Sequence, residues 1–150
     1  MDAAFVISIA IAFVSGAMLT CQIGMNAQMR VLSGSPMWAA VISFVVGLAA
    51  LLAVIVGMRQ PAPTMQGLAS APWWAWCAGL MGAFYVAASA QLAAKLGATS
   101  LTALVVAGQI LASLVIDHFN WFGFADHPVS LARLLGAGLL VGGVVLVLKY

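Results

Sequence analysis

Polar side chains that could bind a solute recur on this otherwise apolar chain at helical spacing. Residues three and four apart share one face of a helix. One such face within residues 3–30 carries Ser8, Ala12, Ser15, Leu19, Gln22, Asn26 and Arg30. A second carries Thr102, Gln109, Ser113 and Asp117, and a third Gly82, Tyr85 and Ser89. Amide, hydroxyl and guanidinium groups donate or accept hydrogen bonds, so these faces indicate recognition of a ligand.

We expect the three faces to line a central cavity. The residues expected to bind a substrate there are Gln109, Tyr85, Gln22, Asn26, Ser89, Ser113 and Arg30. An unpaired amide is costly in hydrocarbon, which favours the cavity for Gln109 and Asn26. The alternative is that serines and glutamines only join helices, through hydrogen bonds that average about 0.6 kcal/mol. That alternative is favoured for Ser8, Ser15 and Ser43.

Catalytic and metal-binding patterns are missing from the sequence. No nucleophile elbow and no HExxH motif is present, so we do not expect an enzyme. Asp117-His118 and Asp126-His127 contain metal-ligand residue types, but they match no standard zinc spacing. We therefore expect neither a metal nor a cofactor, and no nucleic-acid partner.

The acidic residues restrict the class of solute. Asp117 falls at the end of its expected helix, and Asp2 and Asp126 fall outside the apolar stretches. A proton-coupled antiporter for cations usually places an acid inside its pathway. Neutral, aromatic or weakly anionic solutes are therefore easier to accommodate, with Arg30 as the obvious partner for an anion. A further hypothesis is that, in an antiparallel dimer, Arg30 of one copy pairs with Asp117 of the other.

The elements that must position these residues follow from composition. The 150 residues are 65% hydrophobic and only 5% charged, whereas a soluble domain has roughly a quarter charged residues. Lipid must therefore cover most of the surface. Apolar stretches of about 20 residues can each cross a bilayer. We predict an all-α integral membrane bundle forming one transmembrane domain, residues 1–150, with helices at about 3–29, 36–57, 72–93, 99–118 and 131–148.

The flanking cations give little orientation signal. Five spans place the two termini on opposite sides, with Arg59 and Arg133 on the side of residue 1 and Arg30, Lys95 and Lys149 on the other. Lys and Arg in short loops are normally retained in the cytoplasm. Two against three is almost balanced, so we expect insertion in both orientations and an antiparallel dimer. The alternative is that one cation, such as Arg59, sets a single orientation.

Seven sequence runs are distinctive in type and order: Asn26-Ala27-Gln28, Ser43 to Gly47, Gly82 to Tyr85, Leu96 to Ala98, Val105 to Gln109, Ile116 to Phe119 and Arg133 to Gly136. Together they resemble the YdcZ-type, EamA-like branch of the drug/metabolite transporter superfamily. The resemblance covers nearly the whole chain. It implies a multi-pass protein of the bacterial inner membrane that forms half of an inverted-repeat transporter and must dimerise. The chain lacks the first-helix acid of the superfamily's small multidrug exporters.

These observations together predict a small-molecule transporter subunit that lies in the lipid bilayer as an antiparallel, dual-topology homodimer. A second hypothesis is a half-transporter that requires a paralogous partner of opposite orientation. A third is a non-transporting membrane subunit that binds another protein or a lipid.

Overall fold

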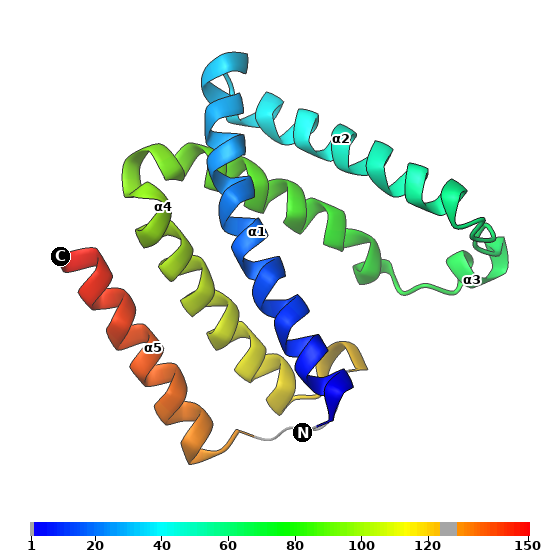
Figure 1. Cartoon of the computed structure of the whole chain (residues 1–150). Helices are drawn as coiled ribbons and strands as arrows, with labels where there is room; N and C mark the ends of the chain where they lie inside the picture. The colour runs from blue at the N-terminus through cyan, green and yellow to red at the C-terminus, as the bar shows by residue number, and fades with distance from the viewer. Residues whose placement is uncertain (1, 124–128) are drawn as a thin grey trace. The chain divides into compact units, whose positions relative to one another are not determined.

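The computed structural model describes residues 2–123 and 129–150, and in these residues all regular structure is helical (Figure 1). The α-helices are α1 (Ala3–Ser33), α2 (Pro36–Gly57), α3 (Met65–Ala69), α4 (Ala78–His118) and α5 (Leu131–Lys149). Short 3₁₀ helices cover Trp73–Cys77 and Trp121–Gly123. The predicted all-α membrane class is confirmed.

Local sequence signals explain where the first two helices begin and end. The Asp2 carboxylate accepts a hydrogen bond from the Phe5 backbone N–H at 2.8 Å and so caps α1. Gly34 ends α1 in the left-handed conformation, with φ of 72°. The Ser35 hydroxyl then caps α2, and Pro36 takes the first helical position, where its missing N–H costs nothing.

A glycine divides α4 into two membrane-spanning halves. Gly97 has φ of 74° and ψ of 165°, which is outside the helical region and open almost only to glycine. The continuous apolar segment Trp73–His118 has 46 residues, about 69 Å of helix at 1.5 Å per residue. A hydrocarbon core is about 30 Å thick. The segment therefore has the length for two crossings.

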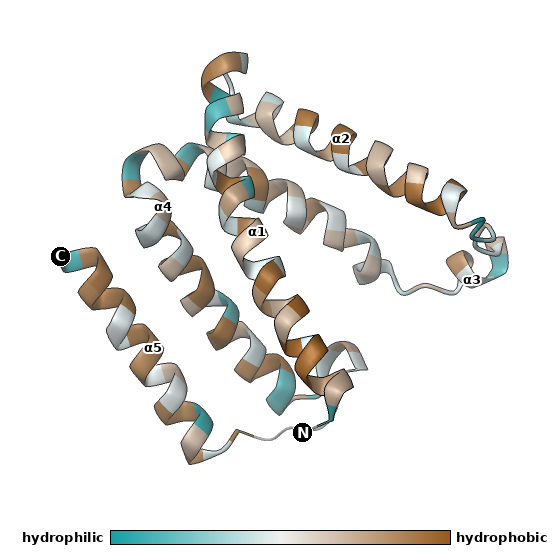
Figure 2. Ribbon diagram, in the orientation of Figure 1, coloured by the Kyte–Doolittle hydropathy of each residue, from teal (hydrophilic) through white to brown (hydrophobic). Residues whose placement is uncertain are grey.

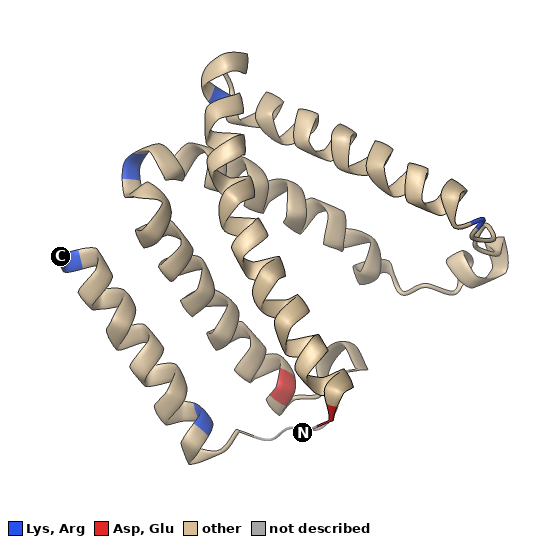
Figure 3. Cartoon of the chain, in the orientation of Figure 1, with Lys and Arg blue, Asp and Glu red and all other residues tan. Residues whose placement is uncertain are grey.

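Four helical segments of the described residues are long and apolar enough to cross a membrane. Because Gly97 splits one of them, they provide five potential crossings. Apolar residues run along these helices, while Lys, Arg and Asp lie near helix ends or near the break in α4 (Figures 2 and 3). Large apolar side chains such as Phe13, Met81 and Leu139 are more than 70% exposed. That exposure suits a surface covered by lipid rather than by water.

The chain divides into two compact units, residues 1–95 and 96–150. In the first, α1 packs on α2, and α2 packs on the first half of α4. Ala40, Val86 and Ala87 form the buried cluster, with Tyr85 packed against it. Small side chains let α2 and α4 approach closely, as is common between membrane helices. The second unit contains the second half of α4 and α5.

The connection between α2 and α4 is more ordered than a plain loop. The Thr64 hydroxyl accepts a hydrogen bond from the Gly67 N–H and caps the short helix α3. The tryptophan-rich segment then forms the 3₁₀ helix Trp73–Cys77, and regular α-helix begins only at Ala78. The third predicted helix therefore starts with a tight 3₁₀ turn.

Candidate functional site

One face of α1 carries three of the predicted binding residues at successive turns. Gln22 is exposed, Asn26 is 7% exposed, and Arg30 is half-buried. No hydrogen bond joins the Asn26 amide to another described residue. The amide nitrogen and oxygen of Asn26 are not among the fully buried unpaired atoms, so a water or a solute can reach them and act as the partner.

The first half of α4 contributes two more predicted residues and one that was not predicted. Ser89 is 4% exposed, and Tyr85 is half-buried against the small-residue cluster. Near the end of this half, Gln91 Oε1 accepts a hydrogen bond from Arg30 Nη1 at 3.5 Å. Arg30 therefore faces the uncharged amide of Gln91 and not a carboxylate.

A groove of about 340 Å³ lies where α1, α2 and α4 meet in the first unit. Gln22 and Ser43 supply its polar groups, and the rest of its lining is Phe44, Gly47, Leu48, Leu51 and Val86. Its volume falls within the range of roughly 300–1,000 Å³ common for small-molecule sites. An apolar surface with a few polar groups can bind a small uncharged molecule and orient it by hydrogen bonds.

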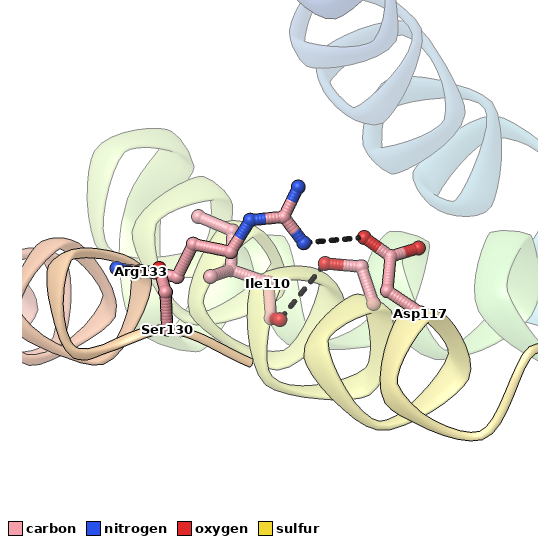
Figure 4. Close-up of polar contacts among 5 residues, drawn as sticks. Ile110, Asp117, Ser130 and Arg133 are labelled. Atoms are coloured by element: carbon pink, nitrogen blue, oxygen red, sulfur yellow. Dashed lines mark hydrogen bonds and ion pairs between the residues drawn. The ribbon is translucent and has the colours of Figure 1, made fainter. Parts of the chain in front are cut away.

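The second unit holds the remaining predicted residues. Gln109 is exposed at the middle of the second half of α4. Ser113 is also exposed, and its hydroxyl donates to the Ile110 carbonyl at 2.9 Å (Figure 4). That backbone bond partly satisfies Ser113, as serines in membrane helices often do. Gln109 therefore has the stronger need for an outside partner.

An ion pair joins the two helices of the second unit. Arg133 Nη1 lies 3.2 Å from Asp117 Oδ2, and Figure 4 shows the guanidinium directed at the carboxylate. The two side chains are 38% and 27% exposed. Asp117 thus has a partner within its own chain, and pairing with Arg30 of another copy is not needed to neutralise it.

Two buried polar atoms in the described residues have no hydrogen-bond partner, Arg30 Nε and Thr102 Oγ1. Each lies on a polar face that the sequence pattern identified. In the same part of the chain, no cluster of three or more His, Cys, Asp or Glu side chains could hold a metal ion. Asp126 and His127, considered above as metal-ligand types, lie outside the described residues.

Sequence reasoning missed Gln91 and the partner of Asp117. Gln91 is a polar residue near the end of an expected span, and it lies two residues after Ser89. A polar side chain at that position could have identified Gln91 as a candidate binding residue. Arg133 was counted only as a loop cation, because nothing in the local sequence shows which charge it faces.

The apolar spans and their polar faces define a multi-pass membrane protein with hydrogen-bonding side chains on its membrane-spanning helices. A protein-family model described as "Putative inner membrane exporter, YdcZ" matches residues 7–146. The chain is 30% identical over 115 residues to "Inner membrane protein YdcZ" of Escherichia coli (strain K12), over 74% of each protein. No solved structure matches.

The chain belongs to this YdcZ family of membrane transporters, and it is a multi-pass protein of the bacterial inner membrane. The predicted resemblance and the predicted location are therefore confirmed. The family is one of exporters and not of enzymes. The seven predicted binding residues stay predictions.

Proposed function

We propose that this protein exports a small neutral, aromatic or weakly anionic solute as an antiparallel, dual-topology dimer. The observation that carries the proposal is the exposed amide of Gln109 at the middle of an apolar span. In hydrocarbon an unpaired amide is costly, so Gln109 needs either a water-filled cavity or a second chain. A transporter dimer supplies both.

The polar residues of the first unit support a solute pathway. Gln22 lines a groove, while Asn26 and Ser89 are buried. With Tyr85, they provide amides and hydroxyls that suit an uncharged or aromatic solute. Arg30 offers the positive charge for an anionic group.

The charges argue against coupling through a membrane-embedded acid. Asp2 caps the start of α1, and Asp117 is engaged by Arg133. A cation antiporter needs a carboxylate that can release and rebind its ion in the pathway. Neither aspartate has that position, which favours solutes that are not cations.

Cysteine labelling tests the pathway. In a background with Cys21→Ala and Cys77→Ala, we expect Gln109→Cys and Asn26→Cys to react with a membrane-impermeant thiosulfonate in whole cells. Leu111→Cys is the matched control, because it lies two residues from Gln109 on another face and is also exposed. If all three cysteines fail to react with the thiosulfonate to the same degree, a water-accessible pathway at these residues is ruled out.

Disulfide cross-linking tests the antiparallel arrangement. Thr102 and Ile116 lie seven residues on either side of Gln109, on the same helical face. If copies meet through this face in opposite orientations, Gln109→Cys links to itself. Thr102→Cys then links to a co-expressed Ile116→Cys chain but poorly to itself. Efficient self-linking of both Gln109→Cys and Thr102→Cys would instead show a parallel pair.

Reporters on the C-terminus test dual insertion. We expect activity from both a cytoplasmic and a periplasmic reporter fused after Tyr150. Signal from only one compartment would reject the homodimer and favour a half-transporter with a paralogous partner.

A further inference from the structure

A second groove in the first unit has no role in the proposed pathway. It has a volume of about 660 Å³ and lies between α2 and the first half of α4. Its walls are apolar, with Phe44, Ala83 and Ala87 among them, and Gln91 is the polar residue in its lining. Both helices are membrane spans, so the groove opens on a surface that lipid chains can reach.

Amide and cationic side chains lie beside one end of the groove, where α2 begins. Pro36 lines the groove and is the first residue of α2, so this end lies where the helix begins. Gln91 lies there too, and its amide contacts the guanidinium of Arg30. Lys95 follows Gln91 by one helical turn, which places it on the same face of α4.

We propose that the groove binds an anionic phospholipid, with an acyl chain between α2 and α4 and the phosphate at Arg30 and Gln91. The guanidinium has five N–H donors, and its contact with Gln91 uses one of them at 3.5 Å. The Nε donor is buried, and the remaining Nη donors suit phosphate oxygens. The charge of Lys95 selects an anionic headgroup over a zwitterionic one.

Native mass spectrometry of the full-length protein tests this proposal. The protein is purified in mild detergent and supplied with phosphatidylglycerol or with phosphatidylcholine of the same acyl chains. We expect preferential retention of phosphatidylglycerol. One Lys or Arg beside an anionic lipid strengthens its binding about five-fold. Arg30→Gln is therefore expected to weaken retention of phosphatidylglycerol by about that factor. Arg59→Gln is the matched control, because Arg59 lies beyond the other end of α2.

A second variant tests the apolar part without touching the charge. Ala83 is exposed in the groove wall, so Ala83→Leu fills space without disturbing a buried contact. It is expected to reduce retention of both lipids while the thermal unfolding temperature stays near that of the wild type. Equal retention of the two lipids, or unchanged retention in Arg30→Gln and Ala83→Leu, would overturn the proposal.

A soluble probe separates a lipid from a free anion. Glycerol 3-phosphate carries the phosphate without the acyl chain. We expect it not to raise the unfolding temperature at concentrations where phosphatidylglycerol does. Stabilisation by glycerol 3-phosphate alone would assign the polar end to a soluble anion instead. None of these measurements uses transport. Arg30 has a role in both proposals, so Ala83→Leu, which changes only this groove, is the variant that separates the lipid proposal from the export proposal.

Discussion

The carboxylate of Asp117 and the guanidinium of Arg133 are 3.2 Å apart, and they join the end of α4 to the beginning of α5. Each charge is at the unfavourable end of its own helix. A carboxylate near a C-terminus and a guanidinium in a first turn both oppose the helix dipole. The ion pair therefore offsets two unfavourable placements while it holds the two helices together.

Removing one member of this pair is expected to destabilise the protein. Asp117→Asn leaves Arg133 without its carboxylate, at a cost of about 1 kcal/mol for a partly exposed pair. The charge swap Asp117→Arg with Arg133→Asp restores the pair and places both charges favourably for the helix dipoles. Thermal unfolding in detergent is expected to show the swap at least as stable as the wild type. A swap no better than Asp117→Asn would contradict this account.

The division of α4 depends on the conformation of Gly97. At φ of 74° and ψ of 165° an alanine is strained, so Gly97→Ala is expected to cost about 1–3 kcal/mol. Gly108→Ala is the matched control, because Gly108 lies in the helical second half of α4 with nothing near an added Cβ. That control is expected to raise stability by up to about 1 kcal/mol. Equal effects at both positions, measured by denaturant unfolding, would show that the break does not depend on glycine.

Close packing of α2 on α4 depends on the missing side chain of Gly82. A Cβ at this position would lie 3.3 Å from Phe44 Cζ, so Gly82→Leu overpacks the contact. We expect a loss of about 1–3 kcal/mol in stability. Adding Phe44→Ala to Gly82→Leu is expected to recover part of that loss, because it opens the space. Gly79→Leu, with nothing near its Cβ, reports the gain in helix propensity alone.

Asn26 is expected to have been retained for function at the expense of stability. The residue is 7% exposed, and its amide forms no hydrogen bond with a described residue, so Asn26→Leu of similar size is expected to raise stability by about 1 kcal/mol. Gln91→Leu removes a hydrogen bond with Arg30 and is expected to give no such gain. Unfolding of both variants in the same detergent makes the comparison. Destabilisation by Asn26→Leu would mean that the amide has a partner that stabilises the fold.

The sequence alone was enough to predict the helices and their setting in a membrane. Hydropathy acts over about 20 residues, and residues such as Gly34, Pro36 and Gly97 act on their own backbone, so both effects are local. The ends shifted by a few residues, because α1 continues to Ser33 and a 3₁₀ turn precedes Ala78. The polar faces were also readable, because they follow from helical spacing alone.

Only the tertiary structure showed which residues meet. The contacts of Arg30 with Gln91 and of Phe44 with Gly82 join residues far apart in the chain. Such contacts depend on how each helix is rotated about its axis and how closely it approaches its neighbour. Small side chains such as Ala40 and Ala87 allow a helix to pack on its neighbour in several rotations about its axis, and each rotation buries a similar apolar surface. The sequence pattern therefore does not determine which rotation the folded protein adopts. For that reason the sequence predicted which helix faces are polar, while the packing of the helices determines which residues those polar side chains contact.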